Sequence, residues 1–165
     1  MNRWDRSGDE GMIGVMSGHE IELLRSYSDG LVLLAERWLA RCRWVNGSTR
    51  GSGRLFADEP VHDERIAAIV REHVPAGAVD WEISWWAPVC LAETAEAARR
   101  VLDTLPESGA VVLLETAQDV DAWCRLIGDV LAALNPYGDG EDRPTSAQMW
   151  LESLLGPLLG GVTAL

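Results

Sequence analysis

The chain has 165 residues, of which 47% are hydrophobic, and its formal net charge is −12 at pH 7. This length and apolar content predict one folded domain and exclude intrinsic disorder. The acidic balance disfavours direct nucleic-acid binding and docking on an anionic membrane, because both surfaces attract cations.

The N-terminal part of the chain predicts a β-hairpin followed by a long helix. Two short extended runs, 2–6 and 11–16, flank a turn that contains glycine, which is typical of a hairpin. Apolar residues then recur at helical spacing over 18–44, which predicts one long helix. Ser17 followed by Glu20 fits a capping box at the start of that helix.

The middle of the chain predicts a loop and three helices. Residues 46–58 are rich in Gly and Ser at their start and predict a flexible loop. A short helix is expected over 63–73. Another should begin at Asp80 and break at Pro88, because proline lacks an amide N–H and disfavours helix at the residue before it. An Ala-rich pattern predicts a new helix over 90–105.

The C-terminal part predicts a strand and two helices. The sequence Leu-Pro-Glu-Ser-Gly stops the preceding helix and leads into an apolar run, 110–115, which is typical of a strand. Because this run is apolar on both faces, we expect it at the centre of a sheet with the hairpin. A helix is expected over 117–134, capped by Thr116 with Asp119, and a last one over 145–159.

Together these elements predict an α+β fold. We expect a mostly α-helical single domain, 1–165, with a small antiparallel sheet made by the N-terminal hairpin and the strand near 110–115. Residues 160–165 should form a loose C-terminal tail.

No motif in the sequence carries a recognisable chemistry. None of the three histidines lies in a catalytic motif, and no His or Cys pair has metal-ligand spacing. We therefore expect no catalytic residue, no cofactor and no bound metal. An enzyme is the least favoured of the function classes, behind a binding or regulatory protein and an adaptor or structural protein.

The three cysteines are candidates for a redox role. Cys42, Cys90 and Cys124 are odd in number and widely spaced, and no apolar signal segment stands near the N-terminus. These features predict reduced thiols and a cytoplasmic protein. Each thiol either packs as a small hydrophobe or senses oxidants. Cys42 is the best single candidate, because Arg41 and Arg43 beside it would favour the thiolate of an exposed side chain.

Arginine and tryptophan supply the candidates for binding a partner. All 14 basic residues are Arg, and five of them fall within 37–54, where there is no Asp or Glu. This run is either a solvated helix end and loop or a patch for an acidic partner, with Arg37, Arg41 and Arg43 as its candidates.

Three tryptophans lie within six residues of each other. Trp81 and Trp85 would share one helical face and are expected in the core. Trp86 points elsewhere and is a candidate anchor for a protein partner, because tryptophan is enriched at interface hot spots. Self-association is left open.

The C-terminal half resembles a known family. The run AARRVLDTLPESGAVVLLETAQDVDAWCRLIGDVLAAL, at 97–134, and the ending MWLESLLGPLL, at 149–159, are similar to an actinobacterial domain-of-unknown-function family. That family includes the oxidative-stress-responsive regulator AosR. The resemblance implies a regulator that acts through an extracytoplasmic-function sigma factor, or an adaptor linked to Clp proteolysis.

The resemblance also implies a disulfide switch between cysteines spaced C-x-x-x-C. This sequence has no such pair, since Cys42, Cys90 and Cys124 lie 48 and 34 positions apart. The switch therefore does not carry over residue by residue, and the redox role stays with the three thiols as candidates.

Overall fold

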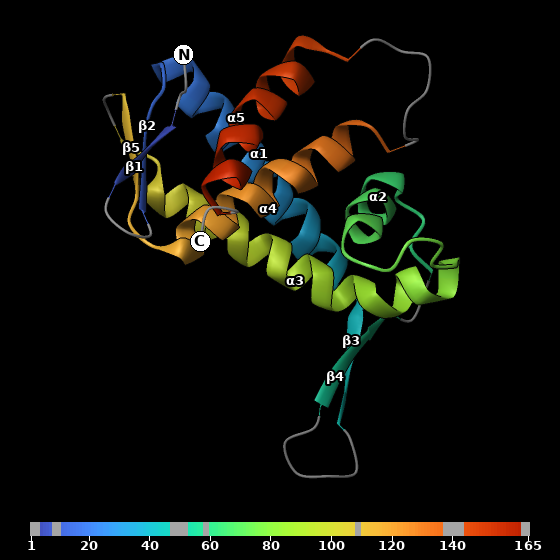
Figure 1. Ribbon diagram of the computed structural model, residues 1–165. Coiled ribbons are helices and arrows are strands. Elements are labelled where there is room, and N and C mark those ends of the chain that lie inside the picture. The colour runs from blue at the N-terminus through green and yellow to red at the C-terminus, as the bar shows by residue number, and fades with distance from the viewer. Residues whose placement is uncertain are drawn as a thin grey trace.

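The computed structural model describes residues 4–7, 11–46, 53–57, 60–107, 110–136 and 144–162. Within these residues the chain forms five α-helices and two small antiparallel sheets. The expected α+β fold, mostly helical with a small antiparallel sheet, is confirmed. Figure 1 shows the three-stranded sheet at one end of the helical body, with α2 at the other end.

The three-stranded sheet joins the N-terminal hairpin to the strand near 110–115, the two segments that were expected to pair. Strands β1 (Trp4–Ser7) and β2 (Gly11–Val15) form the predicted hairpin, and β5 (Val111–Leu114) pairs with β2. All pairs are antiparallel, and the strand order is β1-β2-β5. The predicted partners are therefore correct.

The predicted central place of β5 is wrong, because β5 lies at an edge of the sheet. Its side chains alternate: Val112 and Leu114 are buried, whereas Val111 and Leu113 are exposed. Successive residues of a strand point to opposite faces, and here helices cover only one of them. An apolar run alone does not reveal that its second face is open.

A glycine in β2 allows the sheet to pack closely on the helices. Gly14 lies opposite Trp4, and a Cβ at Gly14 would come within 2.6 Å of the Trp4 ring. The Trp4 ring in turn meets Trp123 edge to face, with the ring centroids 5.3 Å apart and the planes at 80°. The absent side chain at Gly14 thus leaves room for this aromatic pair.

Helix α1 (Gly18–Leu39) begins with the expected capping box. Ser17 Oγ accepts a hydrogen bond from the Glu20 amide at 3.3 Å, and the Ser17 amide donates to Glu20 Oε2 at 2.8 Å. This satisfies two amides that have no partner within the helix. Trp150 of the last helix also donates its Nε1–H to Glu20 Oε1 at 2.8 Å.

The expected end of this helix at residue 44 is wrong. The helix stops at Leu39, and the chain continues into β3 (Cys42–Asn46), which pairs with β4 (Gly53–Ala57). Cys42 and Arg43 therefore lie on a strand. The Cys-Arg-Trp-Val run contains strand-favouring residues, but the apolar residues before it recur at helical spacing, which extended the predicted helix over the strand.

The predicted flexible loop at 46–58 also needs correction. Residue 46 ends β3, and residues 53–57 form β4, so both belong to a hairpin. Residues 47–52 and 58–59 lie outside the described part. Figure 1 shows this hairpin projecting from the helical body below α3.

Helix α2 (Glu64–Glu72) confirms the expected short helix, and Asp63 caps it. Helix α3 (Asp80–Thr104) corrects the expected break, because it runs through Pro88 without interruption. Pro88 is buried among other buried residues of α3. Packing on this face offsets the loss of one backbone hydrogen bond at the proline.

Helices α4 (Ala117–Leu134) and α5 (Ser146–Val162) complete the fold. Thr116 and Asp119 form the expected cap of α4, with Thr116 Oγ1 accepting from the Asp119 amide at 3.2 Å. The expected tail at 160–165 is partly wrong, because α5 continues through Val162 despite Pro157. Residues 163–165 lie outside the described part.

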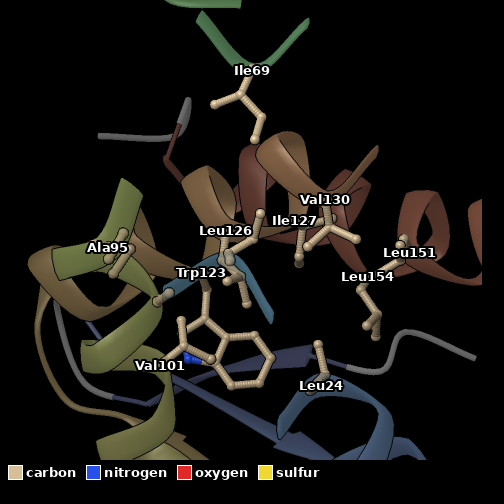
Figure 2. Packing of buried hydrophobic residues seen from close by; sticks show 14 of the residues in the cluster. Leu24, Ile69, Ala95, Val101, Trp123, Leu126, Ile127, Val130, Leu151 and Leu154 are labelled. Carbon is tan, nitrogen blue, oxygen red and sulfur yellow. The ribbon is translucent and has the colours of Figure 1, made fainter. Parts of the chain in front are cut away.

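The core lies where α1, α3 and α4 pack together, with α2 and α5 against α4. Trp123 of α4 is fully buried, and its Nε1–H donates to Thr104 Oγ1 at 2.8 Å. In Figure 2 its ring lies near Leu24 of α1 and Val101 of α3. Buried hydrophobic residues from all five described helices belong to one core cluster.

Candidate binding site

A cavity of about 540 Å³ lies at the end of the molecule away from the three-stranded sheet. One wall is the C-terminal end of α1 with the turn into β3, and the other is the segment that leads into α2. We call it the arginine pocket, and its lining residues are Leu34, Arg37, Trp38, Arg41, Cys42, Pro60, His62, Asp63, Arg65 and Ile66. The volume is in the range of small-ligand pockets.

The α1 wall carries two cations above an apolar surface. Arg37 lies in the last turn of α1, and Arg41 follows four residues later, just beyond the helix end. Both side chains line the cavity. Trp38, which is 9% exposed, and Leu34 form the apolar part of the wall.

The opposite wall carries a cation whose charge is already neutralised. Asp63 Oδ2 lies 2.7 Å from Arg65 Nη2, and Asp63 Oδ1 accepts from Arg65 Nε at 3.1 Å. The side-chain hydrogen bond from Arg65 holds the pKa of the Asp63 carboxyl below its ordinary value. Asp63 also accepts from the Arg65 amide at the start of α2, so both charges serve the helix cap.

Arg37 and Arg41 differ from this pair. Within the described residues, no hydrogen bond or ion pair is found for either guanidinium. The neighbouring Glu36 binds Arg99 instead, with 2.5 Å between Oε1 and Nη2. Two positive charges without a partner among the described residues therefore line the pocket of a chain whose net charge is −12.

The N-terminal half of α3 carries exposed aromatic side chains and is tied to the segment that leads into α2. The amide of Val61 donates to Ser84 Oγ at 3.3 Å, which fixes the pocket segment against the N-terminal half of α3. There Trp86 is 43% exposed, as expected for an anchor. The expected burial of Trp81 and Trp85 is wrong, since they are 68% and 41% exposed. The core-facing side of this half of α3 is occupied by Ile83 and Ala87 instead.

Not all the predicted partner-binding residues come together. Arg37 and Arg41 line the arginine pocket, and Trp86 lies on α3, whose N-terminal half adjoins it. Arg43 does not line the cavity; it lies on β3 with an exposed side chain.

None of the three cysteines forms a disulfide bond within the described residues. Cys90 is buried on α3, and burial raises the pKa of its thiol. Cys124 on α4 is half-buried, and burial raises the pKa of its thiol to about 11. Cys42 lines the arginine pocket, with its Sγ 3.8 Å from the Trp38 carbonyl oxygen. Of the three candidate redox residues, Cys42 alone belongs to the pocket.

A buried polar cluster between α2, α3 and α4 escaped the sequence analysis. Asp129 is fully buried, and its oxygens bind His73 Nε2 at 2.6 Å and Thr94 Oγ1 at 2.7 Å. Arg125 reaches across to Glu93 at 2.9 Å, and its Nη2 donates to the Cys90 carbonyl at 3.1 Å. No spacing signals this cluster, because His73 and Asp129 are 56 residues apart.

Metal sites and membrane-spanning helices were also considered within the described residues. No group of three or more His, Cys, Asp or Glu residues is placed to hold a metal ion. No described helix is both long and apolar enough to cross a membrane.

Comparison of the chain with models of protein families, with curated proteins and with solved structures finds no match. The assignment of a function therefore rests on the residues and their geometry.

Proposed function

We propose that this protein is a non-enzymatic regulatory protein that acts by binding an acidic partner protein. The observation that carries the proposal is that Arg37 and Arg41, in the pocket of an acidic chain, have no partner among the residues that the structure describes. A matching carboxylate would neutralise them, because guanidinium groups bind carboxylates with strong, directed hydrogen bonds.

The exposed tryptophans support a protein as the partner. Trp81, Trp85 and Trp86 expose large aromatic surface on the half of α3 that adjoins the pocket. Tryptophan and arginine are the residue types most enriched at interface hot spots. A partner with acidic and apolar side chains would complement both the arginines and these exposed rings.

Affinity capture with matched baits tests the proposal. The baits are the wild-type protein, the Arg37→Gln/Arg41→Gln double variant and Arg71→Gln. Arg71 is a suitable control because it is exposed, lies on α2 outside the pocket and has no partner among the described residues. We expect one acidic protein to be retained by the wild type and by Arg71→Gln and lost with the double variant. The same captured proteins on all three baits would contradict the proposal.

The family resemblance names the first partner to examine. An extracytoplasmic-function sigma factor, purified and titrated against the three baits, should bind the wild type and Arg71→Gln with similar affinity and the double variant more weakly. A partner of another class that shows this order would keep the proposal and replace the sigma factor.

A redox response of the same site is the second part of the proposal. Cys42 carries it, because it is the cysteine that lines the arginine pocket. Oxidation there would change the charge or bulk next to Arg41. After peroxide treatment, peptide mass spectrometry should find Cys42 modified before Cys90 and Cys124. Equal modification of all three thiols in the folded protein would contradict it.

Cys124 should be alkylated slowly in the folded protein. Because the thiolate is the reactive form, a thiol with a pKa of about 11 reacts slowly near neutral pH. We expect iodoacetamide to label Cys124 in the folded protein only as the pH approaches about 11. In denaturant the same residue should react at an ordinary rate. Fast labelling of folded Cys124 at pH 8 would show that its thiol is not shielded.

A further inference from the structure

We infer that the arginine pocket is also a site for a small organic anion, a phosphate or carboxylate attached to an apolar body. The inference deepens the proposed function, on which it rests for its biological role: such an anion would compete with the acidic partner for Arg37 and Arg41. Its evidence is the shape and lining of the cavity.

The cavity has the size of a ligand site. Its volume of about 540 Å³ exceeds what one carboxylate side chain would fill. Pockets of roughly 300–1,000 Å³ are typical for small molecules and cofactors. The pocket therefore has room for a body of several non-hydrogen atoms besides the charged group.

The lining separates into a cationic part and an apolar part. Arg37 and Arg41 supply the positive charge that is not already used within the described residues. Leu34, Trp38 and Ile66 supply the apolar wall, and Trp38 and Ile66 are largely buried in the core. Asp63 would repel an anion, but Arg65 neutralises it in a bidentate pair. His62 adds a side chain that can donate a hydrogen bond.

This combination favours one class of ligand over its simpler relatives. A bare inorganic anion would meet the arginines but leave the apolar wall in contact with water. A neutral apolar molecule would leave both guanidinium groups without a partner. A molecule that carries both an anionic group and an apolar body satisfies both parts of the lining.

The test is a titration of the full chain, followed by the backbone amide NMR signals. The probes are phenyl phosphate, inorganic phosphate and benzyl alcohol, which carry both features, the charge alone and the ring alone. We expect phenyl phosphate to shift signals from residues 34–42 and 60–66 and to bind at least about tenfold more tightly than inorganic phosphate. Benzyl alcohol should leave these signals in place.

Variants link binding to the two arginines. Arg37→Gln/Arg41→Gln should weaken phenyl phosphate binding by at least about tenfold, whereas Arg71→Gln should not change it. If the double variant does not fold, Arg37→Gln alone serves. Equal affinity of the pocket variant and the wild type would overturn the inference. Inorganic phosphate that binds as tightly as phenyl phosphate would overturn the requirement for an apolar body.

The two proposals can fail separately. If phenyl phosphate does not bind while partner capture still depends on Arg37 and Arg41, the inference is wrong and the proposed function stands. If phenyl phosphate binds at the pocket but capture is the same on all baits, the proposed function is wrong and the ligand site stands. When both hold, phenyl phosphate should release the captured partner.

Discussion

The charged residues between α2, α3 and α4 and the two arginines on the α1 wall of the arginine pocket are used in opposite ways. In the first region, Asp129 is fully buried and binds His73 and Thr94, and Arg125 binds Glu93. In the second, Arg37 and Arg41 have no partner among the described residues. The comparison teaches that paired charges here hold helices together, whereas the unpaired ones are available to bind another molecule.

The core beside the paired charges should give the largest effect on stability. Trp123→Ala removes a fully buried ring that packs on Trp4 and donates a hydrogen bond to Thr104. We expect a loss of about 3–5 kcal/mol in the free energy of unfolding, from the cavity left behind. Urea unfolding measures it. The matched control, Trp81→Ala, removes a ring that is 68% exposed and should cost less than about 1 kcal/mol. Equal costs would contradict the assignment of the core.

Removing the buried carboxylate should have the next largest effect. Asp129→Ala leaves Thr94 and His73 without their acceptor in the interior. We expect a loss of about 3 kcal/mol, as is usual when one partner of a buried pair is removed. Asp121→Ala is the control, because Asp121 is exposed on the same helix. A loss no greater than that of the control would show that the cluster does not hold the helices together.

Asp119 gives a smaller effect that depends on pH. Burial alone would raise the pKa of Asp119, but hydrogen bonds from Thr116 and Arg100 outweigh it and lower that pKa. Since the pKa is lower in the folded than in the unfolded chain, Asp119 stabilises the fold above about pH 4. This contribution is lost as the pH falls through the folded-state pKa.

Asp119→Asn should therefore lower stability near pH 7 by about 1–2 kcal/mol. Its stability should also fall less steeply than that of the wild type when the pH drops below about 4. Chemical unfolding measured across this pH range gives both results. Parallel curves for the two proteins would contradict a lowered pKa.

The smallest expected effect belongs to the pocket. Arg37→Gln/Arg41→Gln breaks no hydrogen bond or ion pair found among the described residues, and it removes only the favourable contact of cations with the end of α1. We expect a loss below about 1 kcal/mol in urea unfolding. A loss as large as that of Asp129→Ala would mean that these arginines have a structural role, and the comparison would no longer hold.

Elements whose signals are local could be predicted from the sequence. The capping boxes at Ser17 and Thr116 and the short helix over 64–72 depend on residues a few positions apart. Elements that depend on distant partners could not. The exposed face of β5 follows from which side the helices cover. The end of α1 at Leu39 was missed for another reason: the β3–β4 hairpin begins inside a run of apolar residues at helical spacing.

The candidate site divides in the same way. The run of arginines without acids pointed to Arg37, Arg41 and Arg43, of which only the first two line the pocket. The opposite wall, with Asp63 and Arg65, belongs to the pocket only because the tertiary fold places residues 60–66 beside the end of α1. No pattern in the sequence indicates that Arg65 is paired while Arg37 and Arg41 have no partner within the described part of the chain. That distinction, on which the proposal rests, required the structure.

The most direct test of this account is the affinity of the purified captured partner for the wild type and for Arg37→Gln/Arg41→Gln, measured at low and at physiological salt. We predict that the wild type binds at least about tenfold more tightly. We also predict that added salt reduces the difference, because ions screen exposed charges. Equal affinities of the two folded proteins at both salt concentrations would contradict the central claim that the unpaired arginines bind an acidic partner.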